Sequence, residues 1–179
     1  MNKSTALSCP SAWRDNTKGG IYKTFLGDLS RIRCIVEIGV DYGYSLFSLA
    51  NDFPEALVVG VDNFSFEGSK DSKEHLQNHL HLFKNIRIFE ASSEEARKIW
   101  ANPDIYCDID LLHIDADHLY DSVKRDFELW VDAVSPGGVI MFHDIKSFPD
   151  DVGKFFDELE GKKERYDVGA GLGFYYKEE

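Results

Sequence analysis

Apolar residues along the chain gather into short runs, and longer segments with apolar positions at helical spacing separate these runs. The first five runs span residues 34–38, 56–62, 86–91, 109–115 and 137–144. Each is hydrophobic almost throughout rather than in alternation, which is typical of strands buried on both faces of a parallel sheet. Two last runs, at 164–169 and 173–177, are joined by a glycine-rich turn. The pattern therefore predicts seven strands.

The segments between the runs predict helices. They span residues 44–52, 69–83, 93–100, 119–134 and 150–160. Pro54 ends the first helix, Ser92 or Ser93 can cap the third, and the sequence SPGG at 135–138 predicts a turn into the fifth strand. Strands that alternate with helices predict an α/β fold with a doubly wound, Rossmann-like, seven-stranded sheet. The sheet should be mostly parallel with an antiparallel C-terminal hairpin, because too few residues separate the last two runs for a crossover helix.

Length and composition limit the class of protein. The 179 residues suit a single domain spanning 1–179, in which residues 1–31 form an N-terminal helical segment. The formal net charge of −12 disfavours nonspecific binding to nucleic acid, because an acidic chain repels a phosphate backbone. No apolar run approaches the roughly 18 residues of a membrane helix, and the N-terminal sequence lacks the apolar core of a signal peptide. Three cysteines without CxxC spacing indicate a reducing compartment, so we expect a cytoplasmic protein.

Candidate chemistry gathers where the predicted strands end. The residues are Glu37, Gly39, Asp41, Gly43 and Ser45 in and after the first strand, Asp62 and Asn63 after the second, Ser92 after the third, Asp115 and His118 after the fourth, and His143 and Asp144 after the fifth. The carboxyl ends of parallel strands meet at one edge of the sheet, and ligands of doubly wound folds bind beyond that edge. One strand that ends in a polar residue means little, whereas five that do so indicate a binding site.

The first strand and its glycines narrow the kind of ligand. The spacing is E-x-G-x-x-x-G, from Glu37 through Gly39 to Gly43, which differs from the G-x-G-x-x-G pattern of dinucleotide-binding folds. Asp41 stands where a pyrophosphate would favour a glycine and no negative charge. Asp62 follows Glu37 by 25 residues, which suits an acid that binds ribose hydroxyls. These features predict a nucleoside site without a pyrophosphate and disfavour a nicotinamide-dependent oxidoreductase.

Five stretches of the chain resemble class I S-adenosylmethionine-dependent methyltransferases. They read VEIGVDYGYSLFSLA, VVGVDNF, FEASSEEA, DLLHIDADHLYDSVKRDFELWVDAVSPGGVIMFHDI and GLGFYYK. The resemblance covers about residues 32–177 and points to the small O-methyltransferases that include catechol-type, macrolide-sugar and cephalosporin-pathway enzymes. It implies divalent-metal-assisted O-methylation of a small-molecule or sugar hydroxyl. The alternatives are a metal-independent methyltransferase, a cephalosporin-hydroxylase-like protein on the same fold, and a cofactor-binding protein without catalysis.

The resemblance also implies roles for the residues at the strand ends. S-adenosylmethionine is expected to contact Glu37, Gly39, Asp41, Gly43, Ser45, Asp62, Asn63, Ser92 and Asp115. Asp62 would hold both ribose hydroxyls. Asp115, His143 and Asp144 would bind a divalent cation, for which we expect Mg²⁺ or Mn²⁺ ahead of iron or zinc. His118, with a pKa near neutrality, is the candidate general base for the acceptor hydroxyl.

Other polar residues have simpler interpretations. Asp117 and Asp121 are expected in the first turn of a helix, facing water. His75 and His79 lie one helical turn apart with no third ligand nearby in the sequence, which predicts a solvated helix face. His113, inside a strand, is expected to be partly buried with satisfied hydrogen bonds. The segment ahead of the first strand leaves little room for a lid, so the site is either open or completed by a second copy in a homo-oligomer.

Overall fold

The computed structural model of the chain describes residues 22, 26, 31–102, 104 and 107–178. The predicted N-terminal helical segment, residues 1–31, therefore lies almost entirely outside the described residues. Within it, Tyr22 and Leu26 are helical, and Tyr22 is buried.

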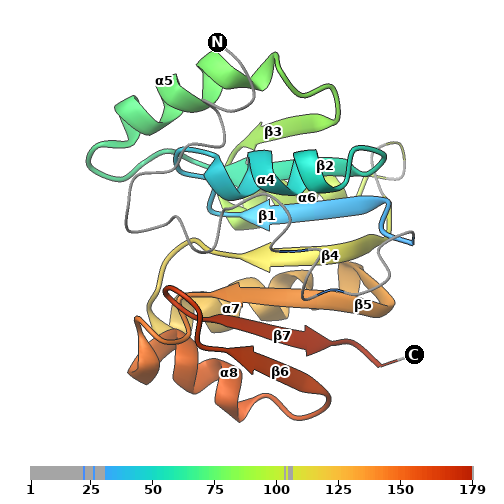
Figure 1. The fold of residues 1–179 in the computed structure, drawn as a ribbon, viewed down its shortest axis with the longest axis vertical. Helices are drawn as coiled ribbons and strands as arrows, with labels where there is room; N and C mark the ends of the chain where they lie inside the picture. The colour runs from blue at the N-terminus through green and yellow to red at the C-terminus, as the bar shows by residue number, and fades with distance from the viewer. Residues whose placement is uncertain (1–21, 23–25, 27–30, 103, 105–106, 179) are drawn as a thin grey trace.

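Seven strands form one sheet, as the sequence predicts. They are β1 (Cys34–Ile38), β2 (Leu57–Asp62), β3 (Ile86–Glu90), β4 (Ile109–Ile114), β5 (Val134–His143), β6 (Lys163–Tyr166) and β7 (Leu172–Tyr176). Their order across the sheet is β3-β2-β1-β4-β5-β7-β6 (Figure 1). The pairs among β1 to β5 are parallel, whereas β7 runs antiparallel to both β5 and β6. The doubly wound, mostly parallel sheet with an antiparallel C-terminal hairpin is thus confirmed.

The helices lie between the strands along the chain. They are α4 (Tyr44–Asp52), α5 (Ser69–Leu80), α6 (Ser93–Trp100), α7 (Tyr120–Trp130) and α8 (Lys154–Glu158). A 3₁₀ turn (Val131–Ala133) follows α7, and a π-helical turn (Pro149–Gly153) precedes α8. The bounds of α4 and α6 agree with the sequence prediction, whereas α5 and α7 end earlier than predicted.

The predicted turn at SPGG is wrong, because these residues belong to β5. Gly137 has a φ of 70°, and the pairing between β4 and β5 changes register between Ile109 and Leu111. Ile109 pairs with Val134 but Leu111 pairs with Val139, so β5 has three more residues than β4 over this stretch. Such a bulge, with Gly137 in a left-handed conformation, lets the strand continue where the sequence suggests that it stops.

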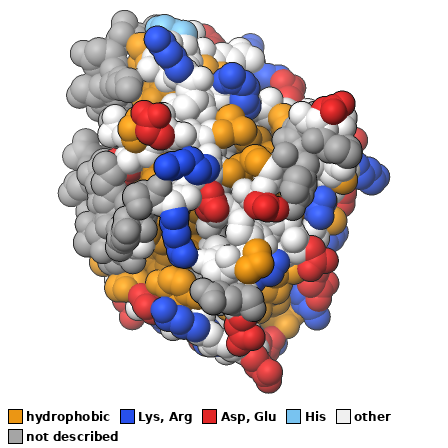
Figure 2. Space-filling model, turned by 90° about the vertical axis from the view of Figure 1, so that its right-hand side faces the viewer, with side chains coloured by type: hydrophobic (Ala, Val, Ile, Leu, Met, Phe, Trp, Pro, Cys, Tyr) orange, Lys and Arg blue, Asp and Glu red, His pale blue; other side chains and the backbone are white. Residues whose placement is uncertain are grey.

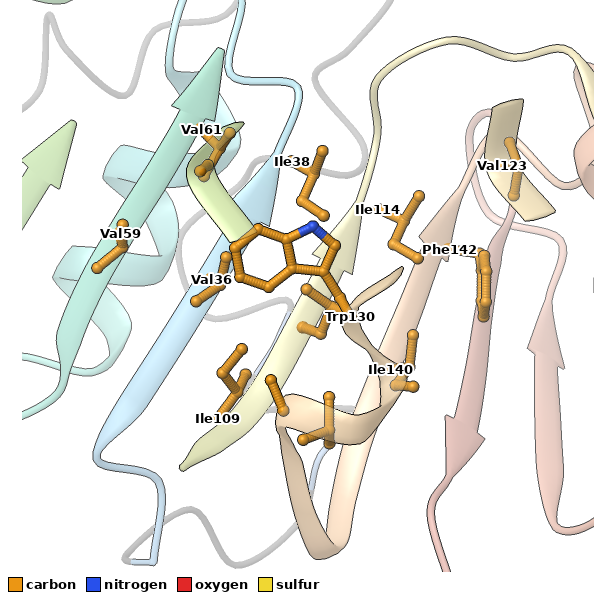
Figure 3. Close-up of a cluster of buried hydrophobic side chains, with 14 of the residues drawn as sticks. Val36, Ile38, Val59, Val61, Ile109, Ile114, Val123, Trp130, Ile140 and Phe142 are labelled. Carbon is orange, nitrogen blue, oxygen red and sulfur yellow. The ribbon is translucent and has the colours of Figure 1, made fainter. Parts of the chain in front are cut away.

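Helices cover both faces of the sheet. One buried cluster lies between the sheet and α4 and α5, and a second lies between the sheet and α6, α7 and α8. Trp130 of α7 occupies the centre of the second cluster, where its indole packs among the aliphatic side chains of β1, β2, β4 and β5 (Figure 3). Its ring nitrogen donates a hydrogen bond to Oγ of Ser93, 3.0 Å away, so α6 and α7 are tied together on this face.

Alternation along the central strands decides where their polar side chains point. Ile35, Leu111 and Met141 belong to the cluster on the α4 and α5 face, while their immediate neighbours in sequence belong to the other cluster. Because side chains two residues apart share a face, the polar residues Glu37, His113 and His143 also point to the α4 and α5 face. The strands thus carry three polar groups into this mainly apolar layer.

The edge at which the parallel strands begin is shown in Figure 2. Over the part of this face that the structure describes, acidic and basic side chains are interspersed, and they form no basic surface of the kind that binds a phosphate backbone. Among the described helices, none has both the length and the hydrophobicity to cross a membrane. The polar strand ends lie at the opposite edge, on the left in Figure 1.

Candidate functional site

A cavity of about 710 Å³ opens at the carboxyl ends of the parallel strands, a size typical of small-molecule sites. Its lining includes most of the residues that the sequence singles out: Gly39, Asp41, Gly43, Ser45, Asp62, Asn63, Ser92, Asp115, His118 and His143. Two predicted site residues, Glu37 and Asp144, lie behind this lining. The convergence of five strand ends on one edge therefore produces a real hollow in the molecule.

The glycines of the loop after β1 are required by the protein's own backbone. Gly39 has a φ of +86°, and a Cβ atom there would lie 2.1 Å from the carbonyl oxygen of Asp115. Gly43 has a φ of +81° and precedes α4, where a Cβ would lie 2.6 Å from Cδ1 of Leu76. Asp41 has a φ of 48°, which is uncommon for a residue with a side chain. The loop is thus a tight turn that packs against the end of β4.

Asp62 holds this loop in place. Its Oδ2 accepts hydrogen bonds from the backbone N–H groups of Val40, at 2.8 Å, and Asp41, at 2.9 Å. Its Oδ1 accepts a third from the N–H of Phe64, at 2.7 Å. A carboxylate offers about four acceptor positions, so three are already used in this arrangement. One acceptor position is left free in this arrangement, and the binding of both ribose hydroxyls by Asp62 stays a prediction.

Ser92 is the N-cap of α6, as the sequence predicts. Its hydroxyl accepts a hydrogen bond from the N–H of Glu95 at 3.3 Å, and its own N–H donates to Oε2 of Glu95 at 3.0 Å, which completes a capping box. The hydrogen bonds that the N–H and the hydroxyl of Ser92 donate to Oε2 lower the pKa of Glu95. Ser92 therefore lines the cavity, but its hydroxyl is already hydrogen-bonded within the cap of α6.

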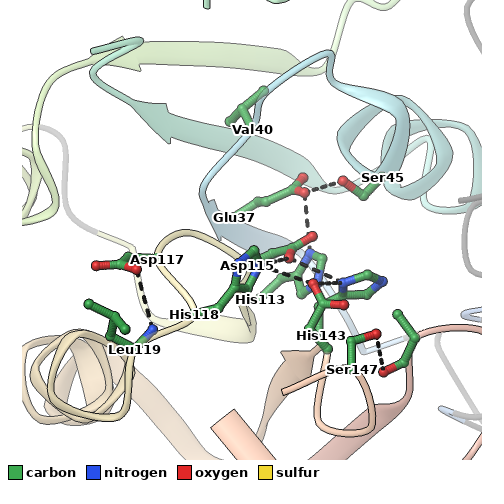
Figure 4. Close-up of polar contacts among 12 residues, drawn as sticks. Glu37, Val40, Ser45, His113, Asp115, Asp117, His118, Leu119, His143 and Ser147 are labelled. Carbon is green, nitrogen blue, oxygen red and sulfur yellow. Dashed lines mark hydrogen bonds and ion pairs between the residues drawn. The ribbon is translucent and has the colours of Figure 1, made fainter. Parts of the chain in front are cut away.

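Glu37 does not reach the cavity. Its side chain is fully buried, and its Oε1 accepts a hydrogen bond from the hydroxyl of Ser45 (Figure 4). Nδ1 of His113 lies 3.3 Å from the same oxygen. Burial raises the pKa of Glu37, an effect that His113 and Ser45 partly offset. Glu37 thus lies outside the cavity lining, and its contact with the cofactor stays a prediction.

His113 also differs from its sequence prediction. It is fully buried, and neither of its ring nitrogens makes a well-aligned hydrogen bond within the described part of the chain. Oε2 of Glu37 is likewise without a hydrogen-bond partner among the described residues. The expectation of a partly buried histidine with satisfied hydrogen bonds is wrong. β4 places this ring on the face of the sheet that α4 and α5 cover.

Two carboxylates and two imidazoles meet where β4 and β5 end. Nδ1 of His143 lies 3.2 Å from Oδ1 of Asp115 and 3.0 Å from Oδ2 of Asp144. Nε2 of His118 lies 3.0 Å from the same oxygen of Asp144 and 3.9 Å from Oδ1 of Asp115. The ring of His118 stacks on Phe148, with centroids 4.4 Å apart and planes 6° apart. Figure 4 shows Asp115, His118 and His143 turned toward one another.

The electrostatics of this cluster are reciprocal. Asp115 and Asp144 raise the pKa of His118 to about 9, and they raise the pKa of His143 to about 10 although burial opposes this. The histidines in turn outweigh burial and lower the pKa values of Asp115 and Asp144. The expectation that His118 has a pKa near neutrality is therefore wrong for the protein alone, since two carboxylates face one imidazole.

The cluster has the donor chemistry of a divalent cation site. Asp115, His118 and Asp144 can each offer one ligand atom, and these atoms lie within 4.8 Å of one another. His143, which the sequence analysis names as a ligand, faces the same two carboxylates. Asp144 has a φ of 64°, and such strain in a residue with a side chain often accompanies function. Oxygen and imidazole donors together suit Mn²⁺, and carboxylates also suit Mg²⁺.

The remaining histidine prediction is wrong. His79 is buried rather than solvated, and its ring lies 4.4 Å from that of half-buried His75. Nδ1 of His75 contacts the carbonyl oxygen of Tyr42 at 2.9 Å, and the ring of Phe47 packs beside both histidines. This face of α5 packs on aromatic side chains of α4, so the two imidazoles serve packing rather than solvation.

Asp117 and Asp121 are both exposed, as predicted, but only Asp121 lies in the first turn of α7, because Asp117 precedes the helix. Asp117 additionally accepts hydrogen bonds from the N–H of Leu119, at 3.3 Å, and from the hydroxyl of Ser122, at 2.7 Å. It therefore orders the turn that carries His118 into α7.

Part of the cavity lining is not predicted from the sequence. Asp126 of α7 borders the cavity and is almost fully buried, and its pKa is raised by burial, partly offset by Ser93. Arg125 lines the same side and pairs with Glu94 at 3.5 Å. A signal was present, because Asp126 lies three residues after Val123 and four before Trp130, on the buried stripe of the helix.

Comparisons with known proteins agree with this geometry. Residues 36–145 match the family model described as a methyltransferase domain. The uncharacterized protein y4gI of Sinorhizobium fredii is 30% identical over 184 residues, which cover 94% of this chain and 20% of that protein. The chain thus spans about a fifth of the length of this curated relative.

Two solved structures share the fold. An O-methyltransferase from Bacillus cereus in complex with S-adenosylhomocysteine (SAH) has a TM-score of 0.63 at 19% identity, covering 82% of this chain and 74% of its own. The MycE methyltransferase of the mycinamycin biosynthetic pathway, in complex with Mg, SAH and mycinamycin VI, has a TM-score of 0.61 at 17% identity. That match covers 88% of this chain and 47% of MycE.

Proposed function

Because the chain belongs to the methyltransferase-domain family, we propose that it transfers a methyl group from S-adenosylmethionine to a hydroxyl oxygen of a small molecule or sugar. The observation that carries this proposal is the cavity bounded by the Gly39–Ser45 loop, Asp62 and the ends of β4 and β5. The Bacillus cereus O-methyltransferase of the same fold was solved with SAH, the demethylated form of the donor.

The walls of the cavity suit a cationic donor. Asp41, Asp62 and Asp115 line the side nearest the Gly39–Ser45 loop. S-adenosylmethionine carries a sulfonium and an amino group, both of which such a lining attracts. Asp62 has one free acceptor position for a ribose hydroxyl, and the side chain of Asn63 lies beside it.

The transfer forms a bond between the acceptor oxygen and the methyl carbon and breaks the bond between that carbon and sulfur. The acceptor loses its hydroxyl proton, and SAH leaves with a neutral sulfur. His118 is our candidate to receive this proton, and it can do so only when it is neutral. Asp115 and Asp144 are the two carboxylates that raise the pKa of His118. A ligand or ion that binds these carboxylates therefore controls the fraction of His118 that is neutral and can act as a base.

We further propose that Asp115 and Asp144, with His143 or His118, hold a divalent cation, Mg²⁺ or Mn²⁺. The MycE structure contains Mg together with SAH, which is consistent with such a site on this fold. When bound, the cation would supply charge that lowers the pKa of the acceptor hydroxyl. The residues of this chain would supply its oxygen and nitrogen donors and orient the acceptor beside them.

A metal-independent methyltransferase is the second candidate, and a specific observation favours it. Asp115 and Asp144 each contact both His118 and His143, whose raised pKa values keep the two imidazoles protonated at neutral pH. Two protonated histidines balance two carboxylates without a cation. In this version the cluster is a preformed ion-pair network that orders the acceptor side of the cavity.

The test of the proposed function is ligand binding followed by turnover. Calorimetry with SAH should give one binding site, and SAH should raise the melting temperature whereas NAD should not. Failure of SAH to bind, with NAD binding instead, would overturn the proposal. Adding a chelator during turnover of S-adenosylmethionine with candidate hydroxyl acceptors separates the two versions, since only the metal-assisted one loses activity.

A further inference from the structure

A second group of possible metal ligands lies behind the cavity. Glu37, His113 and Asp115 can each offer one ligand atom, and these atoms lie within 4.8 Å of one another. Glu37 and His113 are fully buried, and Asp115 is the member that borders the cavity. Asp115 therefore belongs both to this group and to the group with His118 and Asp144.

The buried pair has unused binding capacity. Oε2 of Glu37 and both ring nitrogens of His113 lack a hydrogen-bond partner in the part of the chain that the structure describes. Nδ1 of His113 lies 3.3 Å from Oε1 of Glu37 without the alignment of a hydrogen bond. Buried polar groups in folded proteins nearly always have partners, so unpartnered groups that face one another mark a place where an ion or a water molecule can bind.

We propose that Glu37, His113 and Asp115 form a second cation site, distinct from the cluster of His118 and Asp144. An imidazole between two carboxylates is a mixed nitrogen and oxygen donor set, which suits a divalent transition metal such as Mn²⁺, Fe²⁺, Co²⁺ or Zn²⁺ rather than Ca²⁺. The ion enters from the cavity past Asp115, and the hydroxyl of Ser45 fixes the Glu37 carboxylate from the other side.

Orientation of the ligands supports the assignment. Register pairs Glu37 of β1 with His113 of β4 directly across the sheet, so both side chains rise from neighbouring backbone positions on one face. Asp115 lies two residues beyond His113, on the same face. The edge-to-face contact of the His113 and His143 rings, 6.2 Å apart, holds the imidazole plane from the β5 side. Strand register and ring packing thus orient the side chains of Glu37, His113 and Asp115 toward one another.

The experiment counts ions on the full chain with Co²⁺ as the probe. Protein stripped with chelator is equilibrated with Co²⁺, passed through a desalting column and assayed for bound metal and visible absorption. We expect two ions per wild-type chain, one in Glu37→Gln and one in His113→Ala. Asp144→Asn should also retain one ion, with the absorption spectrum of the buried site. Asp115→Asn should lose both.

His79→Ala is the matched control, because His79 is a buried histidine with an unpartnered Nε2 that lies outside both groups of ligands. It should keep both ions. A Glu37→Gln variant that keeps the wild-type number of ions would overturn the proposal, and so would an Asp144→Asn variant that retains none, whichever number the wild-type chain binds. Glu37→Gln preserves shape, so it gives the answer even where His113→Ala does not fold. The count does not depend on methyl transfer.

Discussion

Oδ2 of Asp144 lies 3.0 Å from Nε2 of His118, so an ion pair joins the end of β5 to the turn that follows β4. Oδ1 of Asp115, which directly follows β4, makes a longer contact with the same nitrogen, at 3.9 Å. The proton on His118 is therefore held by carboxylates from two strands. These two carboxylates therefore decide the protonation state of the His118 imidazole, our candidate general base.

Asp144→Asn should lower the pKa of His118 in metal-free protein from about 9 toward its ordinary value of about 6.5. The substitution removes one of the two charges that stabilise the imidazolium, while Asp115 remains. A titration of the His118 ring followed by nuclear magnetic resonance measures the shift. Asp121→Asn, at an exposed position of α7, should leave the titration unchanged. An equal pKa in wild type and Asp144→Asn would contradict the ion pair.

Gly39→Ala should destabilise the protein by clearly more than about 1 kcal/mol, because its Cβ would lie 2.1 Å from the carbonyl oxygen of Asp115. Gly68→Ala is the matched control. Its φ of +92° is similarly left-handed, but a Cβ there meets nothing within 4 Å. Urea unfolding of both variants therefore separates the conformational cost from the steric cost. Equal losses would show that the contact with β4 relaxes.

Much of this fold can be predicted from the sequence because the strands are continuous apolar runs with clear ends. The bounds of β1, α4 and α6 follow from such runs, from Pro54 and from the Ser92 cap. The bulge at Gly137 could not be predicted, since a serine–proline–glycine–glycine sequence is also the composition of a turn. The burial of His79 was missed because it depends on the aromatic side chains of another helix.

The candidate site likewise has features that can be predicted from the sequence and features that cannot. Parallel strands bring their carboxyl ends together, so the gathering of Asp62, Asp115 and His118 at one cavity follows from topology alone. The hydrogen-bond partners of each side chain do not follow from topology. Glu37 contacts His113, and Asp62 accepts three hydrogen bonds from backbone N–H groups. Such choices depend on a loop geometry that residue types do not specify.

Asp126→Asn should stabilise the protein at pH 7 and lose this advantage in acid. Burial raises the pKa of Asp126 above its unfolded value, so the ionised carboxylate costs free energy only in the folded state. The gain should shrink as the pH falls through the raised pKa and disappear below the unfolded pKa of about 3.9. Urea unfolding at pH 7 and pH 3.5 measures it. Asp132→Asn, at an exposed position, should change little at either pH, and a gain for Asp126→Asn that persists in acid would refute the role of ionisation.

Asp62→Ala should weaken SAH binding and loosen the loop that forms the wall of the site. The loss of a charged hydrogen-bond acceptor typically costs about 1.5–3 kcal/mol, which corresponds to roughly 10- to 150-fold in affinity. Asp62→Asn keeps one oxygen and should bind SAH with an intermediate Kd. Because the N–H groups of Val40 and Asp41 both bond to Oδ2, their amide exchange should accelerate in Asp62→Ala even without ligand.

Calorimetry and hydrogen exchange on the same samples separate the two roles of Asp62. Glu55→Ala, at an exposed turn before β2 and away from the cavity, controls for the change in net charge. Faster exchange with unchanged SAH affinity would limit Asp62 to a support of the loop. Weaker binding with unchanged exchange would mean that the carboxylate contacts the cofactor alone. We expect both to change together, because the carboxylate that we propose to bind the ribose also accepts the hydrogen bonds that close the loop.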